Sequence, residues 1–259
     1  MKILIVGDVC AAPGRRVLNK TLPDLIRREN IDFCIVNGEN AAHGVGITPK
    51  IADEFFRLGA DVITLGNHTF GSYEFLSQVG KYDNIVVPSN VGGKWPGNEY
   101  CIVEKNGFKL GVINLLGQFA MNPIPDNPFN KAEELISRLK DEHVNGIVVD
   151  FHAEATAEKT AMGYLLDGRV SVVFGTHTHV QTADNRVLKG GTGYITDIGM
   201  SGCVDSVIGM EISRSLGRLK DKLPERYDPQ EGEGVMCGVI ASLDDEGRCL
   251  EIRRFNEYE

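Results

Sequence analysis

The sequence predicts an α/β fold in which strands alternate with helices and two β-hairpins add antiparallel strands. Three observations support this prediction. Short runs rich in β-branched residues recur along the 259 residues. Stretches with apolar residues three to four positions apart lie between several of these runs, and two longer apolar segments contain turn residues at their centres. The alternation indicates α/β layers, and the hairpins indicate a mixed sheet or two packed sheets.

The predicted strands are continuous apolar runs, which are typical of strands covered on both faces of a sheet. In chain order they lie at residues 2–9, 32–40, 62–68, 84–90, 146–154, 170–179 and 192–199. The predicted helices carry an apolar stripe on one face, and they lie at residues 14–30, 48–60, 130–143 and 156–166. The sequence contains no repeat and no low-complexity tract. We therefore expect a single domain over residues 1–259.

Two hairpins are predicted from their turn residues. The first covers residues 101–115 and turns at Asn106 and Gly107, a pair that favours a tight two-residue turn. The second covers residues 235–255 and turns around residues 245–247. The segment from 206 to 234 is the most polar part of the chain, and we expect it to form a helix and an excursion before the second hairpin.

The composition narrows the classes of partner. The formal net charge is −9, so the chain lacks the broad basic surface that stable DNA binding requires. The N-terminal apolar run is too short for the core of a signal peptide, and no stretch of 18 apolar residues follows. We therefore expect a cytoplasmic protein without membrane contact. The six cysteines contain no C-x-x-C pair, which favours reduced thiols.

Polar residues of the types that bind metals follow five of the predicted strands. They are Asp8, Glu39 with Asn40, Asn67 with His68, His152, and His177 with His179. The carboxyl ends of parallel strands form the edge of a sheet where ligands bind, so we expect these residues to converge. Imidazoles combined with carboxylate and amide oxygens suit zinc, manganese or iron. The donors are too many for one ion, whereas two ions about 3.5 Å apart, sharing a carboxylate and a hydroxide, can take about six or more protein donors.

The charge of such a site suits a phosphate ester. Two divalent ions held by two carboxylates, Asp8 and Glu39, leave an excess of roughly +2 before hydroxide binds. This excess would supply the positive charge that the acidic surface lacks. His177 and His179 are two residues apart, and on an extended chain they would point to the same side, each toward a different ion, with Thr178 pointing away.

The chain resembles the calcineurin-like metallophosphoesterases in five motifs that occur in the same order. The motifs are "GDV" at Asp8, "NGEN" at Glu39 and Asn40, "GNH" at Asn67 and His68, the single His152, and "GTHTH" at His177 and His179. The stretches "NGENAAHGVGIT", "TLGNHTF" and "TDIGMSG" are also similar to the bacterial YmdB-like family of 2′,3′-cyclic nucleotide phosphodiesterases. The resemblance covers nearly the whole chain. It implies a four-layer α/β/β/α sandwich of two mixed sheets, with a dinuclear metal site among their loops.

The resemblance also implies how the ligands divide between the two ions. Asp8 and His179 would bind one ion, Glu39 would bridge the pair, and the second ion would be bound by Asn67, His152 and His177. The chain departs from the general pattern of the superfamily at two positions. The usual D-x-H motif ends here in Cys10, and the usual bridging aspartate is Glu39. We expect Asn40 to lie on or near the first ion in place of the missing histidine, with water or a Cys10 thiolate as alternatives.

The sequence therefore predicts a dinuclear phosphodiesterase that acts on a small phosphodiester such as a 2′,3′-cyclic nucleotide. Hydroxide shared by the two ions would attack phosphorus in line. His68 is the nearest candidate for the general acid that protonates the leaving oxygen. Iron or manganese is expected, with zinc as an alternative. The native metals, the physiological substrate, the regulatory pathway and the oligomeric state, including a homo-oligomer, stay open.

Two further interpretations of the function compete with this one. A phosphomonoesterase or protein phosphatase would share the same metal site. A regulatory or RNA-interacting protein would bind the metals with weak or no turnover.

Three other polar residues have a less certain place in the site. His43 is either a substrate contact or a surface histidine, and His143 is expected to stabilise the end of a helix. Asp197 is a strand-end acid near the site for which a structural role is favoured.

Overall fold

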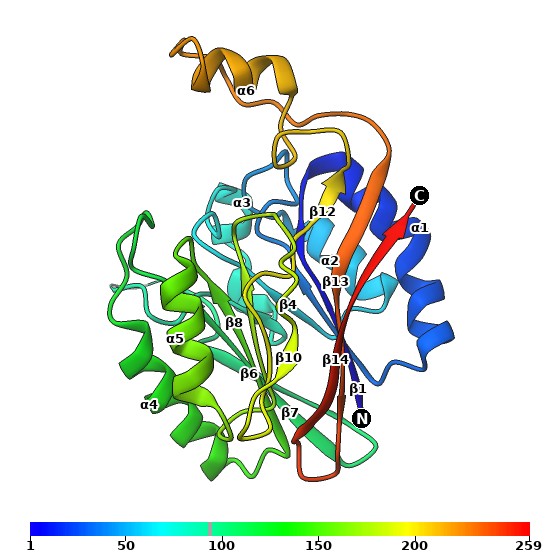
Figure 1. Cartoon of the computed structure of the whole chain (residues 1–259), viewed down its shortest axis with the longest axis vertical. Helices are drawn as coiled ribbons and strands as arrows, with labels where there is room; N and C mark the ends of the chain where they lie inside the picture. The colour runs from blue at the N-terminus through cyan, green and yellow to red at the C-terminus, as the bar shows by residue number, and fades with distance from the viewer. Residues whose placement is uncertain (93–94) are drawn as a thin grey trace.

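The computed structural model describes residues 1–92 and 95–259. These residues form two β-sheets that pack face to face, with helices on both outer faces (Figure 1). The predicted four-layer α/β/β/α fold is therefore confirmed. The strands are β1 (Lys2–Val6), β2 (Asp8–Val9), β3 (Phe33–Asn37), β4 (Val62–Thr64), β5 (Ile85–Val86), β6 (Tyr100–Lys105), β7 (Phe108–Leu116), β8 (Gly146–His152), β9 (Val172–Thr176), β10 (Arg186–Val187), β11 (Gly193–Ile195), β12 (Met200–Cys203), β13 (Gly234–Leu243) and β14 (Cys249–Tyr258). The helices are α1 (Ala11–Glu29), α2 (Pro49–Leu58), α3 (Tyr73–Leu76), η1 (Val79–Lys81), α4 (Pro128–Asp141), α5 (Thr156–Leu166) and α6 (Ile212–Leu219).

Both sheets contain parallel and antiparallel pairs. In the first sheet, β1, β3, β4 and β5 are parallel, and the hairpin of β13 and β14 joins β1 antiparallel. In the second sheet, β7, β8, β9 and β11 are parallel, while β6 and β10 pair antiparallel at its two edges. The first predicted hairpin is β6 and β7. Its turn residues Asn106 and Gly107 both have positive φ, 53° and 77°, as a two-residue turn of this kind requires.

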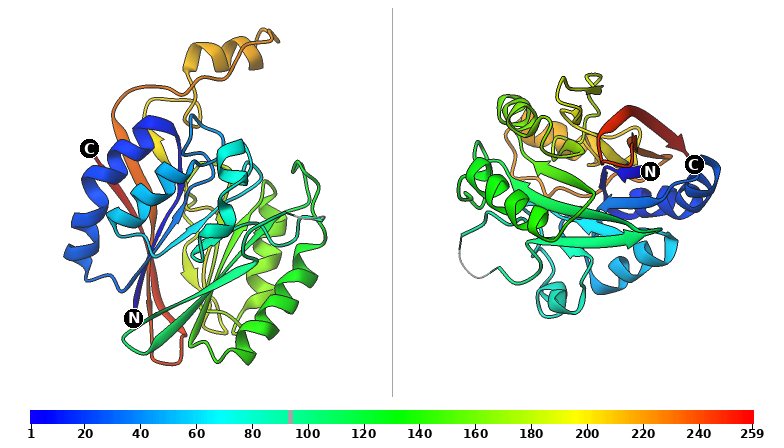
Figure 2. Two further views of the ribbon diagram at one scale, coloured as in Figure 1. Left: turned by 180° about the vertical axis from the view of Figure 1, so that it is seen from behind. Right: turned by 90° about the horizontal axis from the view of Figure 1, so that it is seen from below.

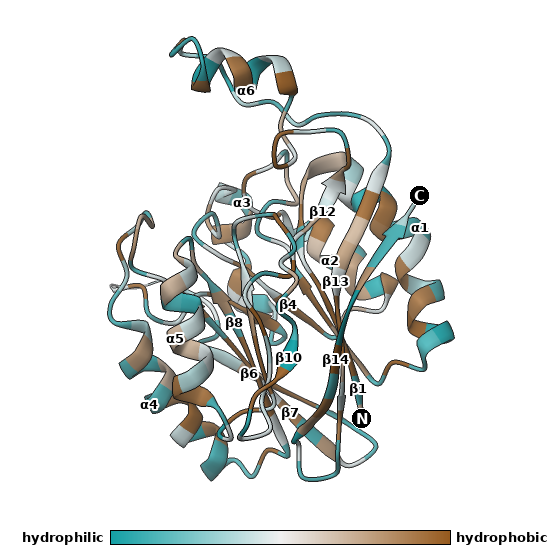
Figure 3. Ribbon diagram, in the orientation of Figure 1, coloured by the Kyte–Doolittle hydropathy of each residue, from teal (hydrophilic) through white to brown (hydrophobic). Residues whose placement is uncertain are grey.

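Three apolar clusters hold the four layers together. Alternate side chains of β1 face opposite sides of the sheet. Leu4 and Val6 pack with α1 and α2, whereas Ile3 and Ile5 pack against the second sheet. The far face of the second sheet is covered by α4 and α5. Figure 2 shows these layers from two further sides, and Figure 3 shows the strands mainly in apolar colours.

Three of the four predicted helices differ from the observed ones by one to three residues at their ends. Residues 156–166 form α5 as predicted, whereas α1 begins at Ala11 instead of residue 14. The segment 206–234 contains α6, as predicted, and Figure 1 shows α6 on an arm that extends beyond the two sheets. Among residues 1–92 and 95–259, no helix is both long and apolar enough to cross a membrane.

Candidate metal centre

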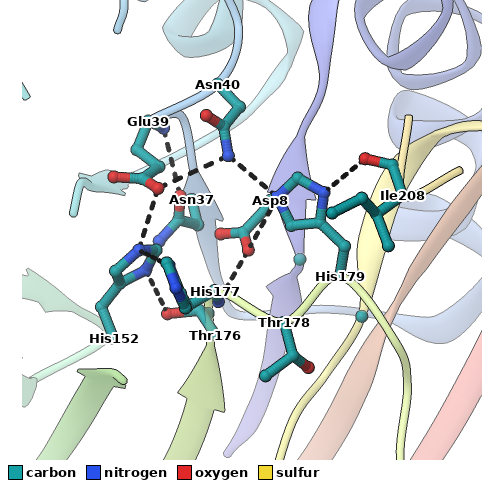
Figure 4. A network of polar contacts seen from close by, with 12 residues as sticks. Asp8, Asn37, Glu39, Asn40, His152, Thr176, His177, Thr178, His179 and Ile208 are labelled. Atoms are coloured by element: carbon teal, nitrogen blue, oxygen red, sulfur yellow. Dashed lines mark hydrogen bonds and ion pairs between the residues drawn. The ribbon is translucent and has the colours of Figure 1, made fainter. Parts of the chain in front are cut away.

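The strand ends that carry the predicted ligands meet at one edge between the two sheets (Figure 4). From the first sheet, Asp8 follows β1, and Glu39 and Asn67 lie just beyond β3 and β4. From the second sheet, His152 is the last residue of β8 and His177 directly follows β9. In each sheet the contributing strands are parallel, so their carboxyl ends lie at the same edge. The packing of the two sheets then brings both groups of residues together.

The first group of donors surrounds His152, and we call it the Glu39 cluster: Glu39, Asn67, His152 and His177. Ligand atoms of Glu39, His152 and His177 all lie within 4.8 Å of one another. The Nε2 atom of His152 is 2.9 Å from Oε1 of Glu39 and 3.1 Å from Nδ1 of His177. Oδ1 of Asn67 is 3.1 Å from the same Nε2 atom. These donor atoms converge on one point, as ligands of a shared cation do.

The second group lies beside the first, and we call it the Asp8 cluster: Asp8, Asn40 and His179. Nε2 of His179 is 3.7 Å from Oδ2 of Asp8 and 2.9 Å from Nδ2 of Asn40. The other ring nitrogen of His179, Nδ1, lies 2.8 Å from the carbonyl oxygen of Ile208. Nδ2 of Asn40 also lies 3.4 Å from Oε1 of Glu39. The two clusters therefore adjoin at Glu39.

His177 and His179 do not lie on an extended chain, so that part of the sequence prediction is wrong. Strand β9 ends at Thr176, and φ is 95° at His177 and 66° at His179. These values are uncommon for residues other than glycine. The backbone leaves the sheet in a turn at these residues. The turn directs the ring of His177 toward the Glu39 cluster and the ring of His179 toward the Asp8 cluster. The side chain of Thr178 points away and donates to Asp197 Oδ2 at 2.8 Å.

The carboxylates and His152 are the buried part of the two clusters, whereas Asn67, His177 and His179 are partly exposed. Asp8, Glu39 and His152 have no exposed surface, and this burial raises the pKa of Asp8. Burial acts in the same direction on Glu39, but the charge and hydrogen bond of His152 lower its pKa to about 2. Burial opposes a charge on His152, yet Glu39, Asp8 and Asp150 together raise its pKa to about 9. The carboxylates around His152 therefore favour a positive charge between them.

One atom of the Asp8 cluster is particularly informative about a cation. Oδ1 of Asp8 is buried and has no hydrogen-bond partner among the residues that the structure describes. Buried polar atoms nearly always have a partner, and a carboxylate oxygen next to imidazole nitrogen is a common metal donor. The residues present therefore fit a divalent cation.

The geometry also bears on the residue that replaces the missing histidine. Asn40 contacts His179 directly. Cys10 instead packs with Ala11 and Met200 in a small apolar cluster. Burial, with a smaller effect of the Asp8 charge, raises the pKa of the Cys10 thiol to about 12, which disfavours a thiolate. Asn40 therefore lies at this position, with its Nδ2 amide, a hydrogen-bond donor, facing His179, whereas ligation of a cation would use its Oδ1 atom.

His68, the predicted general acid, lies next to the Glu39 cluster. Its backbone N–H donates to Oε2 of Glu39 at 3.0 Å, and the residue is half-buried. His43 is exposed and has a φ of 55°, and His143 is an exposed residue just beyond α4. Neither His43 nor His143 belongs to the two clusters.

A layer of buried polar groups beneath the clusters was missed by the sequence analysis. Asp150 has no exposed surface, and its carboxylate accepts hydrogen bonds from Asn37, Thr64 and Thr176 at 3.0, 2.6 and 2.6 Å. Oγ1 of Thr176 also lies 2.8 Å from Nδ1 of His152, so the layer orients a predicted ligand. The signal was present, because an aspartate inside the apolar run "IVVDF" must be buried with its partners.

Two further residues near the clusters were also missed. Oε2 of Glu154 lies 3.3 Å from Nε2 of His177, the ring nitrogen that faces away from His152. A Cβ atom on Gly66 would lie 2.5 Å from Cδ of Glu39 and 2.6 Å from Nε2 of His152. The position of Gly66 directly before Asn67 and His68 was the available signal, since a loop that approaches other backbone or ligands closely often requires glycine.

Comparison with known proteins agrees with the resemblance seen in the sequence. A family model described as "YmdB-like protein" matches residues 4–255. A 2′,3′-cyclic-nucleotide 2′-phosphodiesterase of Bacillus subtilis (strain 168) is 46% identical over 246 residues, which are 95% of this chain and 92% of the relative.

Two solved structures share the whole fold. The crystal structure of a novel phosphatase from Mycoplasma pneumoniae has a TM-score of 0.94 and 32% identity, and the match covers 100% of this chain and 93% of that one. The crystal structure of a hypothetical protein from Thermus thermophilus has a TM-score of 0.93 and 35% identity, with 100% of both chains covered. The resemblance predicted from the motifs is confirmed, and the chain belongs to the YmdB-like protein family.

Proposed function

We propose that the chain is a dinuclear metal-dependent phosphodiesterase whose substrates are 2′,3′-cyclic nucleotides. The observation that carries the proposal is the pair of adjoining clusters, one around the buried His152 and one around the buried Asp8. The name of the Bacillus subtilis relative supports the substrate class. Two bound cations would lower the pKa of a shared water and offset the charge on the phosphoryl oxygens.

The contacts support a division of the ligands between the two cations. The Glu39 cluster would hold one ion through Asn67, His152 and His177, and the Asp8 cluster would hold the other through Asp8, Asn40 and His179. Glu39 would bridge them, because its Oε1 atom lies 2.9 Å from His152 and 3.4 Å from Asn40. The mixed nitrogen and oxygen donors suit iron or manganese, with zinc as an alternative.

His68 is proposed as the general acid for the leaving oxygen. Its hydrogen bond to Glu39 fixes the backbone beside the bridging carboxylate. The half-buried position leaves the residue within reach of a substrate. Imidazole exchanges a proton readily near neutral pH, as an acid for an alkoxide leaving group must.

The variant His68→Ala should keep its metals and lose roughly 10²- to 10⁴-fold in kcat/KM on substrates with poor leaving groups. An activated aryl ester needs little protonation of its leaving oxygen, so its hydrolysis should fall much less. Steady-state kinetics on both substrates, with the metal content measured in the same preparation, would test this. An equal loss on the two substrates would contradict the acid role.

Removal of metal should abolish hydrolysis of 2′,3′-cyclic AMP. Purified protein should contain about two transition-metal ions per chain, and dialysis against a chelator should remove both ions and activity together. Reconstitution with iron, manganese or zinc in separate samples should then identify the ions that restore turnover. Full activity in protein that has been dialysed against a chelator and contains no transition metal would contradict the proposal.

The second candidate function is a phosphomonoesterase, because the Mycoplasma pneumoniae structure is named a phosphatase. The same clusters would serve both reactions, so substrate preference must decide. Comparison of kcat/KM on bis-aryl and mono-aryl phosphates distinguishes them, and we expect a preference for the diester. Two bound metals without turnover on either ester would instead favour a regulatory or RNA-interacting protein.

A further inference from the structure

A buried ion pair lies directly behind the turn that carries His177 and His179. Lys159 belongs to α5 and only 2% of its surface is exposed. Its Nζ atom donates to the carbonyl oxygen of Thr176 at 2.8 Å and to Oδ2 of Asp197 at 2.7 Å. Asp197 has no exposed surface. The lysine thus joins helix α5 to the residue that precedes His177.

The acid of this pair holds the other side of the same turn. Oδ2 of Asp197 accepts hydrogen bonds from both the backbone N–H and the hydroxyl of Thr178, at 3.1 and 2.8 Å. Oδ1 of Asp197 accepts from the N–H of Gly199 at 2.8 Å. Figure 4 shows the side chain of Thr178 directed away from the imidazoles on either side of it. Thr176 and Thr178, the neighbours of His177, are therefore both fixed to one ion pair.

Energetic arguments indicate that this ion pair contributes more to the orientation of the histidine rings than to the stability of the folded protein. The positive φ values of His177 and His179 cost free energy, and such conformations persist only where the surroundings enforce them. A buried ion pair is a weak source of stability, since apolar residues of similar volume often do as well. Hydrogen bonds to both neighbours of His177, however, constrain where its ring points.

We propose that Lys159 and Asp197 are positioning residues for the two histidines of the turn. By holding Thr176 and Thr178, they direct Nδ1 of His177 toward His152 and Nε2 of His179 toward Asp8. The inference rests on the proposed function, because it takes both histidines to be metal ligands. It predicts that the ion pair controls metal affinity without contacting the metals.

The matched variants Thr178→Val and Thr178→Ser test the hydroxyl bond to Asp197. Valine has the shape of threonine but cannot donate, whereas serine keeps the hydroxyl. Metal affinity, measured by competition with a chromogenic chelator, should fall severalfold in Thr178→Val and stay near the wild-type value in Thr178→Ser. The absorption spectrum of the Co²⁺-substituted protein should change in Thr178→Val alone. Equal affinities and spectra in the two variants would contradict the inference.

The variant Lys159→Met removes both hydrogen bonds of the lysine and should weaken metal binding by roughly 10- to 100-fold. The double variant Lys159→Met with Asp197→Asn removes both charges, and we expect its affinity to stay low because the donor to Thr176 is still missing. Leu166→Ala is the control. It lies on the same helix in the apolar cluster beneath α5, so it should lower Tm while leaving metal affinity unchanged.

The outcomes separate this inference from the proposed function. If wild-type protein binds two metals and Lys159→Met binds them equally well, the positioning role is wrong and the proposed function stands. The same conclusion follows if Leu166→Ala loses as much affinity as Lys159→Met, or if the double variant recovers full affinity. Wild-type protein that binds no transition metal would overturn both.

Discussion

Glu39→Gln should abolish phosphodiester hydrolysis, with a loss on the order of 10³-fold or more in kcat/KM. Oε1 of Glu39 lies 2.9 Å from Nε2 of His152, and Oε2 accepts the N–H of His68 at 3.0 Å. An amide has nearly the same shape, but it carries no charge to offset two cations. It would also replace the carboxylate oxygen that lies 2.9 Å from Nε2 of His152, so the metal content should fall together with the activity. Kinetics and metal analysis on one preparation would measure both effects.

Glu39→Asp and Glu246→Gln are the controls for this experiment. Aspartate keeps the charge and shortens the side chain, so we expect part of the metal content and part of the activity to remain. Glu246 is an exposed residue that pairs with Arg248, so its amide variant should behave as wild type. A Glu39→Gln protein that is active with both metals bound would show that the bridge assignment is wrong.

The fold was largely predictable because each strand and helix carries a local signal. The apolar runs of β1, β3, β8 and β9 and the stripe of α5 were visible without knowledge of their neighbours. The Asn106 and Gly107 turn likewise depends on adjacent residues alone. The four-layer arrangement came from the family resemblance, because apolar runs do not reveal which strands share a sheet. The two-residue strand β10 was not predicted, because its residues Arg186 and Val187 are both exposed and form no apolar run.

Some features of the site were also predictable from local signals in the sequence, and others were not. Asp8, Glu39, His152, His177 and His179 could be placed at one edge because strand direction fixes where carboxyl ends lie. The positive φ values at His177 and His179 could not be predicted, because this turn depends on tertiary contacts of Thr176 and Thr178. The contacts of Asp150, Glu154 and Lys159 could not be predicted either, since their partners Thr64, His177 and Asp197 lie in other segments of the chain.

Gly66→Ala tests how closely the loop after β4 must approach the clusters. A Cβ atom at this position would lie 2.5 Å from Cδ of Glu39 and 2.6 Å from Nε2 of His152. Both side chains are fully buried, so neither can move aside without leaving its partners. The methyl group should displace the Glu39 carboxylate by about 1 Å, which corresponds to a loss of roughly 10²-fold in activity. Metal affinity should fall together with kcat.

Gly80→Ala is the matched control for this substitution. Among the described residues, and apart from its own neighbours in the chain, a Cβ atom on Gly80 would meet no heavy atom within 4 Å. The same change of glycine to alanine should therefore leave kinetics and metal affinity unchanged. Both variants should fold. The added methyl group of Gly66→Ala contacts the clusters at the end of the sheets and not the apolar layers, and that of Gly80→Ala has free space around it. If Gly66→Ala binds metals and turns over substrate like Gly80→Ala, then Glu39 and His152 cannot be fixed where the structure places them.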